Sequence, residues 1–179
     1  MKTTNIDYWK KVLLDPTSAY KQLFAEEKKY LTTHIAKGSY VLDVGCGDGT
    51  NIQTILPITQ NIVGIDNDPE ATEDAQTKLS SISSVKIILA DAFSLPFPNE
   101  TFDIVIHMMT LVNLGENKIK ALQEMARVLK NDGKIIMSVY SDDAFPARLE
   151  MYTQIDVPIE KTDGARVIFD KSVGANESE

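Results

Sequence analysis

Five short apolar segments recur along the chain, and most of the gaps between them carry a helical pattern of apolar residues. The segments span residues 40–44, 61–65, 85–90, 102–108 and 134–140. Each has the length of a strand and is apolar on both faces, which is typical of strands buried in a parallel sheet. The sequence therefore predicts an α/β fold, a mostly parallel twisted sheet with helices on both faces.

Capping residues and apolar spacing place the helices. We expect helices over residues 15–38, 50–56, 68–80 and 116–130. The pairs Asp15-Pro16 and Asp68-Pro69 open two of them, because aspartate caps a helix and proline fits its first turn. Lysines of the first helix alternate with Glu26 and Glu27, so we interpret this side as a solvated face.

Length and charge limit the classes of protein to which the chain can belong. Its 179 residues suffice for one domain with a sizeable core. The 26 acidic residues against 18 basic ones give a net charge of −8. This charge disfavours nucleic acid and an anionic membrane surface as partners. We expect no metal site.

The N-terminus and the single cysteine indicate the compartment. The longest largely apolar run, residues 105–112, is far shorter than a bilayer span. Residues 1–7 lack the apolar stretch of a secretory signal, and Cys46 alone allows no intrachain disulfide. We therefore expect a cytoplasmic protein with no membrane partner.

A glycine-rich turn follows the first strand, at the end where open parallel sheets bind ligands. The glycines of Gly45-Cys46-Gly47-Asp48-Gly49 have the spacing G-x-G-x-G, whereas a dinucleotide fingerprint is G-x-G-x-x-G, and no P-loop lysine follows. Asp43, just before the turn, and Asp48, within it, would repel a phosphate and suit a cationic group. A phosphate ligand is therefore disfavoured.

Carboxylates also end the next two strands. Asp66, with Asn67 beside it, ends the second strand and can accept hydrogen bonds from both hydroxyls of a ribose. Asp91-Ala92-Phe93 ends the third strand and offers a carboxylate for an exocyclic amine and backbone groups for the edge of an adenine ring. Three strand ends thus converge on one nucleoside.

The segment Val41 to Thr50, with these spaced acids, resembles motif I and its partners in the class I S-adenosylmethionine-dependent methyltransferases. The resemblance covers roughly residues 30–141, with Asn131-Asp132 where many members have Pro-Gly. It implies a three-layer Rossmann-like methyltransferase fold and S-adenosyl-L-methionine as cofactor. It also implies cofactor-binding roles for Asp43, Gly45, Cys46, Gly47, Asp66, Asn67, Asp91, Ala92, Phe93 and His107.

The resemblance assigns parts of the cofactor to some of these residues. Asp43 would hold the methionine end through its amino group or an ordered water, with the main chain of Gly45 to Gly47 against it. His107 would lend its backbone carbonyl to the same amino group, and a general-base role for its side chain stays open. Cys46 is interpreted as a packing residue. No catalytic residue is assigned.

The methyl acceptor is not identified. No Asn/Asp-Pro-Pro-aromatic motif follows the fourth strand, so a nucleic-acid base is not favoured. Met108, Met109, Tyr8, Trp9 and Tyr20 either line an apolar small-molecule pocket or pack in the core. We expect a methyltransferase acting on a small molecule. The alternatives are a catalytically silent, nucleoside-binding regulatory domain and, against the glycine spacing, a nicotinamide-dependent oxidoreductase.

The C-terminal segment departs from the family pattern. Members add a helix and two strands that form an antiparallel hairpin at the sheet edge, whereas only 38 residues follow Ser141. Of these, residues 165–169 read as a strand and residues 171–179 show no apolar periodicity. The hypothesis is that the C-terminal strands are incomplete and that the fifth strand is an open edge for a homodimer. We expect three parts: an N-terminal helical cap over the cofactor site (1–38), the cofactor-binding core (39–141) and an acidic segment (142–179).

Overall fold

A computed structural model describes residues 8–169 of the chain. These residues divide into two compact units, one of residues 27–139 and one formed by residues up to 26 together with those from 140 onward. Each unit is described by itself below. The domain boundaries expected after residues 38 and 141 stay predictions.

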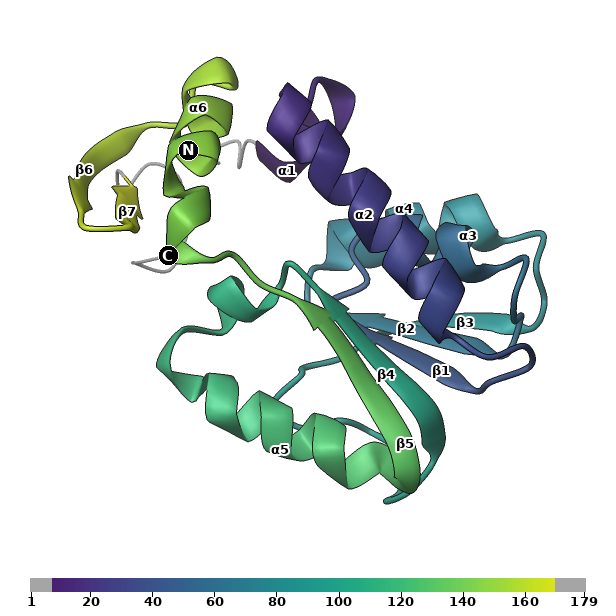
Figure 1. Cartoon of the computed structure of the whole chain (residues 1–179). Helices are drawn as coiled ribbons and strands as arrows, with labels where there is room; N and C mark the ends of the chain where they lie inside the picture. Colours follow the sequence, from purple (N-terminus) through teal and green to yellow (C-terminus); the bar gives the residue numbers. More distant parts are fainter. Residues whose placement is uncertain (1–7, 170–179) are drawn as a thin grey trace. The chain divides into compact units, whose positions relative to one another are not determined.

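A five-stranded parallel sheet forms the centre of the first unit (Figure 1). Its strands are β1 (Val41–Val44), β2 (Ile62–Asp66), β3 (Val85–Leu89), β4 (Phe102–Met108) and β5 (Leu129–Ser138). They lie in the order β3-β2-β1-β4-β5, and every neighbouring pair is parallel. The winding direction therefore reverses between β1 and β4, where open sheets of this kind bind ligands.

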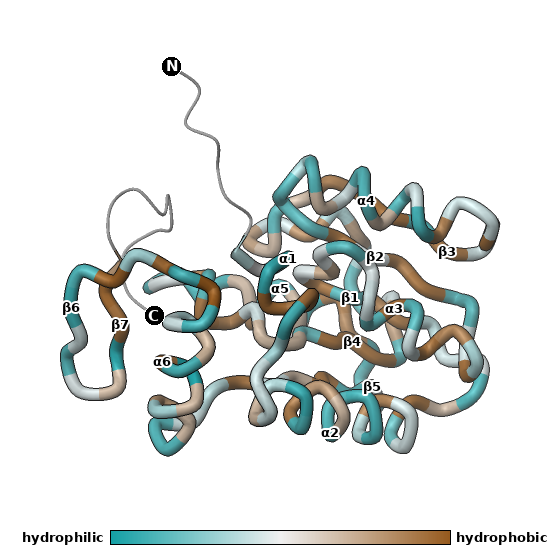
Figure 2. The backbone as a smooth tube through the Cα atoms, turned by 90° about the horizontal axis from the view of Figure 1, so that it is seen from above, coloured by the Kyte–Doolittle hydropathy of each residue, from teal (hydrophilic) through white to brown (hydrophobic). Residues whose placement is uncertain are grey.

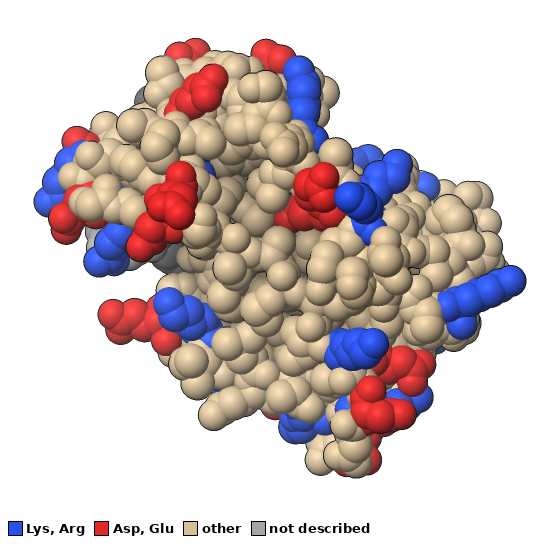
Figure 3. All heavy atoms as spheres, in the orientation of Figure 1, with Lys and Arg blue, Asp and Glu red and all other residues tan. Residues whose placement is uncertain are grey.

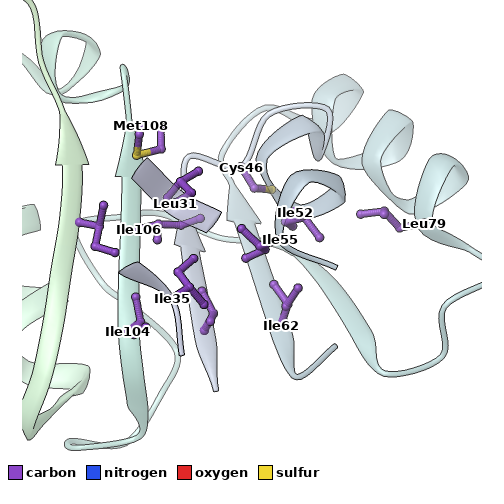
Figure 4. Close-up of a cluster of buried hydrophobic side chains, with 12 residues drawn as sticks. Leu31, Ile35, Cys46, Ile52, Ile55, Ile62, Leu79, Ile104, Ile106 and Met108 are labelled. Atoms are coloured by element: carbon purple, nitrogen blue, oxygen red, sulfur yellow. The ribbon is translucent and has the colours of Figure 1, made fainter. Parts of the chain in front are cut away.

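Helices cover both faces of this sheet (Figure 1). One face carries α3 (Thr50–Ile55), α4 (Pro69–Leu79) and the C-terminal part of α2 (Ser18–His34), and the other carries α5 (Lys118–Val128). On the α2 side, one hydrophobic cluster joins residues of the helices to the strands, as Figure 4 shows for Leu31, Ile52 and Ile106. On the α5 side, a second cluster includes Met125 and Phe102. The predicted three-layer α/β fold is confirmed.

Chain hydropathy explains why these strands are central. In Figure 2 the strands β1, β2 and β4 are coloured as apolar along most of their length. All four residues of β1 are buried, including Asp43. Strands covered on both faces leave no room for alternating polar residues.

The first predicted helix starts later than expected. A separate helix, α1 (Tyr8–Leu14), precedes it, and α2 begins at Ser18 and not at Asp15-Pro16. Thr17 supplies the cap, since its hydroxyl accepts the backbone N–H of Tyr20 at 3.4 Å. A threonine in the cap position satisfies a helix N–H as aspartate does. The prediction was therefore wrong in placing the cap of this helix at Asp15 and not at Thr17.

The turn before the fifth strand also differs from the prediction. Helix α5 ends at Val128, and β5 begins directly at Leu129, so Asn131-Asp132-Gly133 lies inside the strand. Phe102 pairs with Leu129 and Ile104 pairs with Lys134, which places the extra residues in a bulge. A bulge absorbs additional residues without breaking the ladder on either side.

The second unit has a core of its own. It contains α1, the first part of α2, α6 (Phe145–Gln154) and an antiparallel pair of strands, β6 (Ile159–Asp163) and β7 (Arg166–Phe169). Short 3₁₀ turns cover Leu111–Asn117 in the first unit and Asp142–Ala144 in the second. The core includes Val12, Tyr20, Met151 and Ile155.

The predicted C-terminal organisation was partly wrong. The strand expected over residues 165–169 is present as β7, but the helix α6 and the strand β6 are present too. The two strands pair with each other and not with the five-stranded sheet. Among the described residues β5 pairs only with β4, and a homodimer through that edge stays a prediction. Residues 171–179 lie outside the described range.

Candidate functional site

The glycine-rich turn joins β1 to α3 and is held against the end of β2. The backbone N–H groups of Gly45 and Cys46 donate to the carbonyl of Ile65 at 2.8 and 2.9 Å. Gly45 has a φ of +76°, and a Cβ there would lie 2.5 Å from Cγ2 of Thr110. Gly47 has a φ of +51°, and apart from its two chain neighbours no described residue has an atom within 4 Å of a Cβ built on it. The space beside Gly47 is therefore open to a ligand.

The two glycines should respond differently to alanine. We expect Gly45→Ala to lower the free energy of unfolding by about 3 kcal/mol, since it adds a clash with Thr110 to an unfavourable backbone conformation. Gly47→Ala meets only the backbone cost, about 1–2 kcal/mol. Urea denaturation of both variants measures the difference. Equal losses would contradict the tight fit of Thr110 against Gly45.

Asp66, at the end of β2, holds the glycine-rich turn through both carboxylate oxygens. Oδ2 accepts the N–H of Gly47 at 2.8 Å, and Oδ1 accepts the N–H of Asp68 at 2.9 Å. Each oxygen keeps a second lone pair for a further donor. The half-buried Asp66 therefore combines a fixed position with capacity for hydroxyl groups of a ligand, whereas Asn67 beside it is exposed.

Asp43, within β1, is fully buried. Its exposed fraction is 0%, and neither carboxylate oxygen has a hydrogen-bond partner among the described residues. Burial, with a smaller contribution from the nearby charge of Asp66, raises the pKa of Asp43 from 3.8 to about 8. A buried carboxyl group without a partner is costly, and a cation or hydrogen-bond donor would compensate it. Asp43 thus fits the amino end of a cationic ligand.

His107 is equally buried, at the end of β4. Its Nδ1 donates to the carbonyl oxygen of Val44 at 2.7 Å, and its Nε2 is buried with no partner in the described part of the chain. Burial lowers the pKa of His107, against the opposing effect of the Val44 bond. Burial therefore favours the neutral ring, which links β4 to β1 through the bond to Val44. A substrate could use it as a base only by reaching the buried Nε2.

The end of β3 carries the predicted adenine contacts. Asp91 is exposed, and its Oδ1 accepts the N–H of Phe93 at 2.8 Å, which fixes the turn. Ala92 and Phe93 are half-buried against the α5-side cluster. The N–H of Ala90 donates to the carbonyl of Asp66 at 2.9 Å, so this turn lies beside the end of β2. The structure thus places all three predicted strand ends at one edge of the sheet.

Two further residues of the glycine-rich turn have structural partners. Cys46 is 4% exposed and lies in the α2-side cluster near Ile52 (Figure 4). Burial, followed by the charges of Asp43 and Asp66, raises the pKa of its thiol, so it stays protonated and is no nucleophile. Asp48 forms an ion pair with Lys78. The negative charge of Asp48 is therefore compensated by a lysine of the same protein.

The aromatic and methionine residues considered for an apolar pocket are spread over different clusters. Tyr20 lies in the core of the second unit, where its hydroxyl is 2.8 Å from that of Tyr140. Tyr8 packs against the same core, and the side chain of Trp9 lies outside the described ones. Met108 belongs to the α2-side cluster of the sheet. These positions favour core packing for Tyr20 and Met108.

Sequence reasoning missed Glu27. Glu27 is half-buried as a whole, and its Oε1 atom is fully buried without a hydrogen-bond partner among the described residues. Burial raises the pKa of Glu27, and a hydrogen bond from Ser138 opposes this shift. Glu27 fills the gap between Leu23 and Leu31 in the apolar stripe of its helix, four residues from each. That interruption was the available signal, and the solvated face inferred for Glu27 was wrong.

Residues 8–169 also bear on two other kinds of site. No three histidine, cysteine, aspartate or glutamate side chains gather there in a way that could hold a metal ion. None of the helices in this range is both long and apolar enough to cross a membrane.

Comparisons with known proteins agree on one class. A family model described as a methyltransferase domain matches residues 42–137. The demethylmenaquinone methyltransferase of Staphylococcus aureus is 33% identical over 121 residues, which cover 66% of this chain and 50% of that protein. The chain spans about half the length of the curated relatives it matches.

Solved structures share the fold. The PH0226 protein from Pyrococcus horikoshii has a TM-score of 0.68 and 24% identity, covering 92% of this chain and 76% of that one. A SAM-dependent methyltransferase from Aquifex aeolicus has a TM-score of 0.64 and 22% identity, covering 93% and 94%. At these identities the likeness concerns the arrangement of helices and strands.

Proposed function

Because the chain belongs to the class I methyltransferase family, we propose that it transfers a methyl group from S-adenosylmethionine to a small-molecule acceptor. The observation that carries this proposal is the buried carboxyl group of Asp43, which has no hydrogen-bond partner within residues 8–169 and lies beside the open glycine-rich turn. S-adenosylmethionine has an ammonium group and a sulfonium centre and no phosphate, which suits an acidic site that disfavours phosphate.

Each strand end has a part in holding the cofactor. Asp43 receives the amino group, and the open backbone at Gly47 lies against the methionine end. Asp66 accepts the ribose hydroxyls with the lone pairs that the turn leaves free. Asp91 and the backbone near Phe93 recognise the adenine edge, with Ala92 between them. The bound cofactor supplies an electrophilic methyl group on a positively charged sulfur.

A small molecule is the preferred acceptor class. One relative is named for demethylmenaquinone, which is a small molecule. The net charge of −8 disfavours nucleic acid. On the face drawn in Figure 3, lysine and arginine side chains are interspersed with acidic ones, as on an ordinary solvated surface. These observations favour a small molecule over a nucleic acid as the acceptor of the methyl group.

Calorimetric titration tests the cofactor site. We expect both S-adenosylmethionine and its demethylated product S-adenosylhomocysteine to bind, and Asp66→Ala to weaken both by about 100-fold, since it removes a fixed acceptor of two hydroxyl hydrogen bonds. Asp132→Ala, an exposed acid on β5, is the matched control and should bind as the unmodified chain does. Thermal denaturation confirms that each variant is folded.

The alternatives give different results. Binding without transfer of labelled methyl to any of a panel of small acceptors would favour a catalytically silent, nucleoside-binding regulatory domain. Binding of a nicotinamide dinucleotide in place of S-adenosylmethionine would favour an oxidoreductase. Full affinity in Asp66→Ala would show that the ribose contact is assigned to the wrong residue.

A further inference from the structure

A carboxyl group that the proposed function leaves unused lies at the ends of β4 and β5. Glu27 is on α2, one helical turn before Leu31, which is fully buried against the sheet. Ser138 ends β5, two residues beyond Ile136, which belongs to the same cluster as Leu31. Residues two apart in a strand share a face. Glu27 and Ser138 therefore meet on the α2 side, at the ligand-binding end of the sheet.

Hydrogen bonds orient this carboxyl group. The Ser138 hydroxyl donates to Glu27, and the same hydroxyl oxygen accepts the backbone N–H of Met109 at 3.0 Å. Met109 has a φ of +55°, a conformation that residues other than glycine rarely adopt. Strained backbone of this kind clusters at ligand sites. Ser138 thus ties Glu27 to the turn that follows β4.

One oxygen of the group has capacity for a ligand. Glu27 Oε1 is buried and lacks a hydrogen-bond partner within residues 8–169. The neighbouring charged residues of its own helix, Glu26 and Lys28, are exposed, and the titratable groups ending the adjacent strands are Asp43 and His107. Burial, opposed by Ser138, is the cause of the raised pKa of Glu27. A buried carboxyl group with one oxygen left without a partner in this range is suited to accepting a proton from a substrate.

The sheet order separates Glu27 from the proposed nucleoside contacts. Asp43 and Asp66 lie on β1 and β2, and Asp91 lies in the turn that follows β3. The strands β4 and β5 lie on the other side of β1. A cofactor held over β3 to β1 leaves its reactive end toward β4. The acceptor then approaches from the side of β4 and β5, where Glu27 lies.

We propose, on the basis of the proposed function, that Glu27 is the proton acceptor for a protic substrate, a molecule whose hydroxyl or amine group X–H is methylated. Atom X forms the new bond to the methyl carbon with its lone pair. The sulfur keeps the electron pair of the broken S–C bond and becomes neutral. The X–H proton passes to the Glu27 carboxylate, and the products are X–CH₃ and S-adenosylhomocysteine.

The position of Glu27 can be tested without knowing the substrate. Carbon-13 NMR of the glutamate carboxyl groups follows the titration of Glu27, whose signal is identified by its loss in Glu27→Gln. We expect the pKa of Glu27 to be about one pH unit lower in the complex with S-adenosylmethionine than in that with S-adenosylhomocysteine, because only the former carries a cation at sulfur. Glu26→Gln, a change at the exposed neighbouring residue, is the control and should leave the difference in the Glu27 pKa unchanged.

Each outcome bears on a different claim. The same Glu27 pKa in both complexes would overturn the placement of Glu27 beside the transferred methyl group while leaving the proposed function intact. If neither S-adenosylmethionine nor S-adenosylhomocysteine bound, the proposed function itself would be overturned. Transfer of labelled methyl to phenols or to aliphatic amines distinguishes the two kinds of X–H group. With whichever of these two kinds of molecule accepts the methyl group, Glu27→Gln should slow methyl transfer by about 100-fold. An unchanged rate would contradict the proposal.

Discussion

Replacing Asp43 with asparagine is expected to weaken S-adenosylmethionine binding by about 100-fold and to stabilise the free protein at pH 8. The loss of affinity follows because the substitution removes the charge proposed to meet the cofactor amino group in a buried place. The gain in stability follows because a neutral amide has no buried charge to maintain. Calorimetry and urea denaturation measure the two effects on the same sample.

The pH dependence of this prediction has a definite sign. The folded protein keeps the proton of Asp43 up to about pH 8, whereas the unfolded chain releases it near the ordinary value of 3.8. Between these values the unfolded state binds fewer protons, so the free energy of unfolding falls as pH rises. The effect is absent below about pH 4 and is complete above about pH 8.

The Asp43→Asn variant should lack this decline. Its free energy of unfolding, measured in urea at pH 5 and pH 8, should change less than that of the unmodified chain. Asp132→Asn, which alters an exposed acid, is the control and should follow the unmodified chain. Parallel pH profiles for all three proteins would show that Asp43 titrates normally and has a partner in solution.

Local sequence rules predicted the elements whose own residues decide them. The start of α4 is an example, because the Asp68 side chain accepts the N–H of Glu70 at 2.9 Å and Pro69 occupies the first turn. The buried strands were equally predictable, since a run such as Val41 to Val44 is apolar without interruption except for Asp43. That exception, a carboxylate in a buried strand, was itself the signal for the site.

Elements that depend on distant partners were not predictable in this way. Strand β6 reads Ile159-Glu160-Lys161-Thr162-Asp163, and four of its five residues are exposed, so no apolar period marks it. Its pairing with β7 determines its structure. The same holds for Glu27, whose surroundings depend on Ser138, a residue of β5 that is distant from it in the sequence. A sequence shows the interrupted stripe but not the side chain that meets it.

Arg127→Met is expected to lower the free energy of unfolding by about 3 kcal/mol. Arg127 lies on α5 and donates to the carbonyls of Phe97 and Leu95 at 2.8 and 3.0 Å and to both carboxylate oxygens of Glu124. Glu124 in turn accepts the N–H of Leu95 at 2.9 Å. Methionine keeps the apolar stem but none of these bonds, several of which involve charged groups.

Arg127→Met should also change the pH dependence of stability and lower the affinity for the cofactor. The hydrogen bond from Arg127 is the main cause that lowers the pKa of Glu124 to about 2, so this pair stabilises the fold above the ordinary pKa of 4.5 and less as pH falls toward 2. Arg127→Met should lose that part of the acid dependence. Residues 95–99 follow directly on the turn that carries Asp91 and Phe93, so cofactor affinity should fall as well.

Lys130→Met provides the matched control. Lys130, near the start of β5, also forms an ion pair, with Asp103 at 2.6 Å, but both side chains are about 40% exposed. Exposed pairs of this kind contribute about 0–1 kcal/mol. Urea denaturation should therefore separate the two variants clearly. If Arg127→Met lost no more stability than Lys130→Met, the burial of Leu95 and the packing of Phe97 on Phe102 would be enough to hold the segment.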